Sequence, residues 1–149
     1  MTLFFDTNIL IDHALMRLTG QPLEITKIIF WAGNENIPIF ISSGSFYTFA
    51  YVLQKNGIKK TELRVKLREY LTMVNIINTD KEIILNGLDS SLSDIEDSFQ
   101  YMAAANEKCD YLITSNLADF KAHKTRQTVP ITPLEFVSKV LGKKKGTDF

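Results

Sequence analysis

The chain has 149 residues, 45% of them hydrophobic, which is enough to bury the core of one domain without disulfides or a structural metal. Lys and Arg total 17 and balance 17 Asp and Glu, so recognition of a polyanion by net charge alone is excluded. No apolar run is long enough to cross a membrane, and the single cysteine, Cys109, cannot form an internal disulfide. We therefore expect one globular domain in the cytoplasm, without a secretion signal and without a membrane contact.

Short apolar runs alternate with longer amphipathic segments, and the two patterns are typical of strands and helices. In chain order, the predicted elements are a strand at residues 3–5, a helix capped by residues 6–8, a helix at 21–34, a strand at 38–41, a helix at 42–53, a helix at 60–71, a strand at 73–77, a helix at 80–88, a helix opened by Ser93, strands at 111–114 and 128–131, and a closing helix that begins at Pro133. Ser93 and Glu96 have the spacing of a capping box at the start of their helix.

Strands that alternate with helices predict an α/β fold, in which helices cover both faces of a parallel sheet. The predicted domain covers residues 1–141. Residues 142–149 contain three consecutive lysines between two glycines, and we expect them to form a flexible basic tail. In open α/β sheets, functional groups gather beyond the carboxyl ends of the strands, where the strand order reverses.

Three acidic residues satisfy this rule. Asp6 follows the first strand, Asp97 lies in the first turn of the helix before the fourth strand, and Asp119 follows the fourth strand. If the first and fourth strands are neighbours, the three carboxylates meet, and their repulsion weakens the fold unless a cation neutralises it. Oxygen ligands without His or Cys favour Mg²⁺ or Mn²⁺. Such an ion suits phosphodiester hydrolysis, because it activates water and binds a phosphate oxygen.

Structural roles would also explain these residues one by one. Asp6 has the position of a helix cap, and Asp119 the position of a residue that stabilises a turn. Asp94 and Asp97 would both interact favourably with the N-terminus of their helix. Glu96 is better explained as half of the capping box than as a catalytic group. Only the joint placement of the acids favours a metal site.

Several blocks of sequence occur together in an informative order. They are FDTNILID at 5–12, SDIEDSFQYMAA at 93–104, DYLITSNLADF at 110–120 and PITPLEF at 130–136. With these blocks, the chain resembles the PIN domain family, and in particular its VapC-type toxin branch, over nearly its whole length.

The resemblance implies a three-layer sandwich with a five-stranded parallel sheet in the order 3-2-1-4-5. It also implies an endoribonuclease that depends on Mg²⁺ or Mn²⁺ and cleaves RNA, of a kind that often forms a homodimer and is often held inactive by an antitoxin protein. Carried over residue by residue, the metal ligands and catalytic residues are Asp6, Asp97 and Asp119. Asn8 and Asn116 would be nearby polar supports.

One position departs from the family pattern. Family members carry a glutamate in the helix after the second strand, where this chain has Thr48. No carboxylate lies between Glu35 and Glu62, so a small realignment cannot supply one. Asp94, one helical turn before Asp97, is expected to replace part of the lost charge. The departure keeps a second class of function open, namely a catalytically weak or inert PIN-like module that binds RNA or a protein.

The distribution of basic and aromatic residues indicates which partners the protein could bind. Basic residues gather at 55–68 and 121–145, which predicts either flanks for RNA or merely solvated surfaces. The helix at 43–54 has aromatic residues on more than one face, which predicts a homodimer or antitoxin contact unless both faces are buried. His13 and His123 lack the spacing of metal ligands and are expected at packing or surface positions. Cys109 is expected in or near the core.

Overall fold

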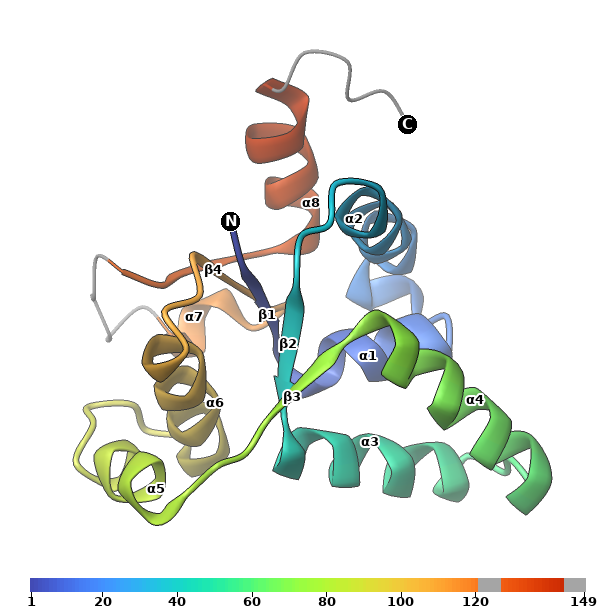
Figure 1. The fold of residues 1–149 in the computed structure, drawn as a ribbon, viewed down its shortest axis with the longest axis horizontal. Coiled ribbons are helices and arrows are strands. Elements are labelled where there is room, and N and C mark those ends of the chain that lie inside the picture. The colour runs from blue at the N-terminus through green and yellow to red at the C-terminus, as the bar shows by residue number, and fades with distance from the viewer. Residues whose placement is uncertain (121–126, 144–149) are drawn as a thin grey trace.

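The computed structural model describes residues 1–120 and 127–143, and it contains five strands in one parallel sheet (Figure 1). The strands are β1 (Leu3–Phe5), β2 (Ile39–Ser42), β3 (Asn75–Ile77), β4 (Tyr111–Ile113) and β5 (Val129–Ile131). Their spatial order is β3-β2-β1-β4-β5, and each neighbouring pair is parallel. The predicted α/β class and strand order are therefore confirmed, and β1 lies directly beside β4.

Helices and short helical turns connect the strands. They are α1 (Thr7–Ala14), η1 (Leu18–Gly20), α2 (Pro22–Asn34), α3 (Ser43–Lys55), α4 (Lys60–Met73), α5 (Lys81–Leu88), α6 (Ile95–Asn106), α7 (Leu117–Phe120), α8 (Pro133–Glu135), η2 (Phe136–Val140) and η3 (Leu141–Lys143). The predicted strands and helices all occur, close to their expected bounds. The short helix α7 is an addition, because its four residues are too few to show a helical period.

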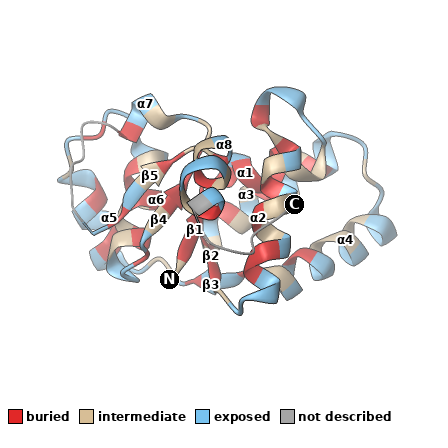
Figure 2. Cartoon of the chain, turned by 90° about the horizontal axis from the view of Figure 1, so that it is seen from above, coloured by how far each residue is buried: buried red, intermediate tan, exposed pale blue. Residues whose placement is uncertain are grey.

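Successive residues of β1 pack on opposite faces of the sheet, as the two-residue period of a strand requires. Leu3 and Phe5 belong to a core that α1, α2, α3, α4 and η2 complete, whereas Phe4 belongs to a second core with α5, α6 and α7. All three side chains are fully buried, and the red strand β1 in Figure 2 lies between the helices of the two cores. The predicted three-layer sandwich is thus confirmed.

The start of α6 differs from the prediction. Asp94 is its N-cap, and Asp94 Oδ1 accepts a hydrogen bond from the backbone N–H of Asp97 at 2.9 Å. The capping box predicted from Ser93 and Glu96 is therefore wrong. Both Ser93 and Asp94 can cap a helix, and the chain uses the second, which shifts Glu96 to a position where its side chain makes a different contact.

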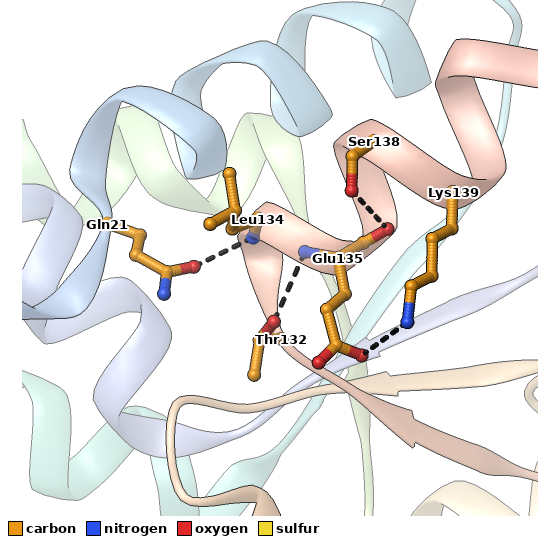
Figure 3. Close-up of polar contacts among 6 residues, drawn as sticks. All are labelled: Gln21, Thr132, Leu134, Glu135, Ser138 and Lys139. Atoms are coloured by element: carbon orange, nitrogen blue, oxygen red, sulfur yellow. Dashed lines mark hydrogen bonds and ion pairs between the residues drawn. The ribbon is translucent and has the colours of Figure 1, made fainter.

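The closing helix begins at Pro133, as predicted. Thr132 Oγ1 accepts from the backbone N–H of Glu135 at 3.2 Å, and Gln21 Oε1 accepts from the backbone N–H of Leu134 at 2.7 Å (Figure 3). Gln21 also precedes α2, so one side chain joins the starts of α2 and α8.

Part of the predicted basic surface lies outside the described residues, namely Lys121, Lys124, Arg126 and residues 144–149. The prediction for His123 also lies outside them. His13 packs as predicted, with Nδ1 2.7 Å from Tyr70 Oη and Nε2 3.0 Å from Thr26 Oγ1. Cys109 is fully buried, also as predicted. Within residues 1–120 and 127–143, none of the helices has the length and apolar character that a bilayer span requires.

Candidate functional site

The candidate site begins where β1 and β4 end side by side, paired through Phe5 and Ile113. The next residues are Asp6 and Thr114, and Thr114 Oγ1 donates a hydrogen bond to Asp6 Oδ2 at 3.0 Å. The backbone N–H of Thr7 donates to Asp6 Oδ1 at 2.8 Å, which makes Asp6 the N-cap of α1. Both oxygens of this carboxylate are therefore held at the strand end.

A cavity of about 280 Å³ lies over this junction. Its lining consists of Asp6, Thr7, Asn8, Ile11, Arg17, Thr48, Val52, Asp94, Glu96, Asp97, Asn116 and Asp119. The structure thus brings together all seven residues that the sequence predicts for the site, from α1, α3, the start of α6 and the β4–α7 region. Their placement agrees with the prediction, while their chemical roles stay a prediction.

The buried carboxyl group of Asp6 is electrostatically unfavourable in its ionised form. Asp6 is 3% exposed, and this burial is the main cause that raises its pKa to about 6. The hydrogen bonds from Thr114 and Thr7 lower the pKa, and the negative charges of Glu96 and Asp94 raise it further. Burial outweighs the two hydrogen bonds, so the site would favour a positive charge beside Asp6.

Asp97 shows the repulsion among the carboxylates most clearly. Burial is again the first cause, and the charges of Asp6, Asp94, Asp119 and Glu96 add to it, so that the pKa of Asp97 rises to about 7. A carboxylate whose ionisation is disfavoured by neighbouring negative charges is typical of functional sites, and a bound cation would relieve this repulsion.

Glu96 does not have the capping-box role that the sequence predicts, and its side chain makes another contact. Thr7 Oγ1 donates to Glu96 Oε1 at 3.4 Å and also shares a hydrogen bond with Ser45 Oγ of α3. Thr7 thereby links the starts of α1, α3 and α6 around the cavity. Glu96 precedes Asp97 in the first turn of α6. The sequence can therefore place Glu96 at the site only if the first residue of that helix is predicted correctly.

Thr48 lines the cavity from α3, which agrees with its alignment to the missing glutamate. Ser42 Oγ caps this helix by accepting from the backbone N–H of Ser45 at 3.1 Å. Helix α3 therefore contributes a hydroxyl group to the cavity, and the alignment of Thr48 with the glutamate of the family stays a prediction. Asp94, predicted to replace part of that charge, does line the cavity, but its Oδ1 is also the cap of α6.

The donors at the cavity fit a hard divalent cation such as Mg²⁺ or Mn²⁺, because they are carboxylate, amide and hydroxyl oxygens. In the part of the chain that the structure describes, no three His, Cys, Asp or Glu side chains are already grouped as a metal site. The hydrogen bonds to both oxygens of Asp6 and to one oxygen of Asp94 hold these two carboxylates in their present orientations.

Besides Glu96, Thr7 and the apolar lining residues Ile11 and Val52, the predicted set lacks two further polar residues of the site, Thr114 and Arg17. Thr114 directly follows β4, so the rule on strand ends that selects Asp6 could also have selected it. Arg17 reaches the cavity from the turn after α1, and no spacing or motif in the sequence indicates that position.

The fold and the cavity define an α/β protein with an acidic site at the switch point of its sheet. A model of the PIN domain matches residues 2–118, and the chain therefore belongs to the PIN domain family. The chain is similar to ribonuclease VapC1 of Aquifex aeolicus (strain VF5), with 26% identity over 118 residues, which cover 76% of this chain and 80% of that protein.

Two solved structures share the fold. The crystal structure of VapBC2 from Rickettsia felis, bound to a DNA fragment from their promoter, contains a chain with a TM-score of 0.68 and 18% identity that covers 89% of this chain and 98% of its own length. A toxin-antitoxin complex from Klebsiella pneumoniae contains a chain with a TM-score of 0.61 and 24% identity, covering 88% and 97%. The predicted resemblance to VapC-type PIN domains is thereby confirmed.

Proposed function

We propose that this protein is an endoribonuclease of the VapC toxin type, which hydrolyses RNA phosphodiesters in the cytoplasm with Mg²⁺ or Mn²⁺. The observation that carries the proposal is the convergence of Asp6, Asp97 and Asp119 on one cavity at the β1–β4 junction. The similarity to ribonuclease VapC1 supports the same reaction.

Each group at the cavity has a defined task in this proposal. Asp6, Asp97 and Asp119 would hold the ion and are the catalytic residues, while Asp94 and Glu96 would add negative charge in place of the missing carboxylate of α3. When bound, the ion supplies a water molecule of lowered pKa and a positive charge for a phosphate oxygen. The polar side chains that support these groups are Asn8, Thr48 and Asn116.

The direct test is cleavage of labelled RNA by the purified protein. We expect cleavage with Mn²⁺, none with EDTA, and a loss of at least about a hundredfold in the Asp6→Asn variant, because one anionic ligand is removed. Asp119→Asn, at an exposed position, is a second variant that leaves the hydrogen bonds of Asp6 in place. Circular dichroism checks that each variant is folded. Cleavage that survives both EDTA and the substitutions would contradict the metal mechanism.

The alternative function is a catalytically weak or inert PIN-like module that binds RNA or a protein. The observation that favours it is Thr48, because α3 brings a hydroxyl group to the cavity where family members have a carboxylate. Calorimetry separates the two functions. Heat of Mn²⁺ binding that disappears in Asp6→Asn supports the nuclease, whereas absence of binding to the unmodified protein supports the inert module.

We also propose an antitoxin protein and a second copy of this chain as partners. On α3, Phe49 is fully buried, but Tyr47 is 76% exposed and Tyr51 is 58% exposed, so part of the aromatic surface lies outside the core. The structural relatives from Rickettsia felis and Klebsiella pneumoniae are toxin–antitoxin assemblies, which agrees with a protein partner.

The homodimer has a test of its own. Sedimentation should give about twice the mass of the 17.0 kDa chain, and Tyr47→Glu should yield a folded monomer because the charge cannot be buried at an interface. Leu71→Glu, on the exposed side of α4, is the matched control and should leave the mass unchanged. A monomer at every accessible concentration would contradict the dimer and leave the antitoxin contact as the role of Tyr47 and Tyr51.

A further inference from the structure

Among the residues that the structure describes, Arg17 is the one basic side chain that lines the acidic cavity. It lies there together with five carboxylates, and the other described lining residues are uncharged. The side chain of Arg17 is 44% exposed, so its guanidinium can be reached by a molecule that enters from solvent. A strand of RNA approaching this cavity would meet repulsion from the acids and attraction from this residue.

The turn after α1 holds Arg17 in place with several specific contacts. The backbone N–H of Arg17 donates to Asp12 O at 2.9 Å and that of Met16 to His13 O at 3.3 Å. This pair of hydrogen bonds forms a Schellman motif. In it, Met16 has a φ of 50°, in the left-handed region that favours glycine. The chain therefore ends α1 with a conformation that is unusual for methionine, and this turn directs Arg17 toward the cavity.

The side chain of Arg17 is held as well as its backbone. Arg17 Nη1 lies 3.7 Å from Asp12 Oδ1, and Asp12 itself is 7% exposed. Gly20 packs against this carboxylate so closely that a Cβ at Gly20 would overlap it. The contact with Asp12 is long for an ion pair, and a guanidinium has five N–H donors, so Arg17 retains the capacity to bind a second anion.

We propose that Arg17 binds a phosphate of the RNA strand beside the scissile bond and is the positioning residue of the active site. This inference rests on the proposed function, because it names the group that holds the substrate of the same site. A planar guanidinium matches the geometry of a phosphodiester, and it makes charge-assisted hydrogen bonds that no other lining residue offers. Asp12 holds the orientation of the guanidinium, and the carboxylates on the other side of the cavity act at the phosphate that reacts.

The test compares two arginine variants with a control at an exposed lysine far from the cavity. The probe is a fluorescein-labelled single-stranded RNA of mixed sequence, and the measurements are its Kd by anisotropy in EDTA and kcat and KM of its cleavage in Mn²⁺. Lys108 is the control cation, because it is exposed in the turn between α6 and β4, at the opposite end of the sheet from the cavity and outside both basic segments. Lys108→Ala therefore removes one exposed cation without touching the site.

For Arg17→Ala we expect Kd and KM to rise about tenfold, with a much smaller change in kcat, because one charged hydrogen bond to the substrate is lost. The slope of log Kd against log salt concentration should fall by about 0.7, the value for one phosphate contact with a single strand. Arg17→Lys should restore the salt slope but only part of the affinity. Lys108→Ala should match the unmodified protein in every measurement.

The outcomes separate this role from the proposed function. If the unmodified protein cleaves RNA and Arg17→Ala keeps its Kd, KM and salt slope, the role of Arg17 is wrong and the nuclease proposal stands. The role is also wrong if Lys108→Ala weakens binding as much as Arg17→Ala does. If the unmodified protein neither binds nor cleaves RNA, the nuclease proposal and the role of Arg17 both fall.

Discussion

In EDTA, Asp97→Asn is expected to raise the free energy of unfolding by about 1 kcal/mol at alkaline pH, whereas in Mn²⁺ the same substitution is expected to reduce RNA cleavage at least about a hundredfold. The cause is the position of this carboxylate among the other acids of the cavity. Burial, followed by the charges of Asp6, Asp94, Asp119 and Glu96, raises the pKa of Asp97 to about 7. A residue that weakens the metal-free fold and is needed for activity is a residue selected for its chemistry.

The sign of the pH dependence follows from the raised pKa. An unfolded chain has its aspartates at a pKa near 3.9, so the folded protein holds the proton of Asp97 more tightly than the unfolded chain does. This contribution to stability is complete below about pH 4 and is lost as the pH rises through about 7. Asparagine has no carboxyl group to ionise, so the Asp97→Asn variant does not lose this stability as the pH rises. Partial exposure of Asp97 and its favourable place at the start of α6 reduce the gain to about 1 kcal/mol.

Urea unfolding in EDTA at about pH 5 and about pH 8 measures this effect. The stability advantage of Asp97→Asn over the unmodified protein should be larger at the higher pH, and added Mn²⁺ should stabilise only the unmodified protein. Glu35→Gln is the control, because Glu35 is exposed before β2, at the opposite end of the sheet from the cavity. An advantage that is independent of pH would show that repulsion among the carboxylates is not the cause.

Most of the fold follows from local patterns in the sequence. Apolar runs such as residues 111–114 and amphipathic segments such as residues 21–34 are long enough to reveal their periods, and they alternate as a parallel sheet requires. Asp6, Asp97 and Asp119 are likewise accessible from the sequence, because the carboxyl ends of adjacent parallel strands share one edge. These predictions depend on rules that hold without knowledge of side-chain packing.

The parts that the sequence does not predict depend on choices between nearly equal local contacts. Ser93 and Asp94 are both good helix caps, and the use of Asp94 sends Glu96 to Thr7 and the cavity instead of to a capping box. The position of Arg17 depends on a left-handed Met16, a conformation with no signal in the sequence, because turns of this kind normally carry glycine. Such details set the charge of the site without changing the fold.

The turn that holds Arg17 also makes a strong prediction about stability. Gly20→Ala is expected to lower the free energy of unfolding by about 2 kcal/mol, because the new Cβ would overlap the side chain of Asp12. The overlap includes the Cβ of Asp12 as well as its carboxylate, so rotation of the side chain cannot remove it. Either α1 or η1 must shift, and the contact between Asp12 and Arg17 would shift with it.

Thermal unfolding should show this loss as a decrease of roughly 4–8 °C in Tm. The matched control is Gly33→Ala in α2, where a Cβ meets no described atom within 4 Å apart from its chain neighbours and the backbone of its own helix. Alanine favours a helix over glycine, so this variant should gain about 0.5–1 kcal/mol. RNA binding should weaken in Gly20→Ala and not in Gly33→Ala, since only the first displaces Asp12. If both variants were equally stable and bound RNA equally well, Gly20 and Asp12 would have no part in holding Arg17 at the cavity.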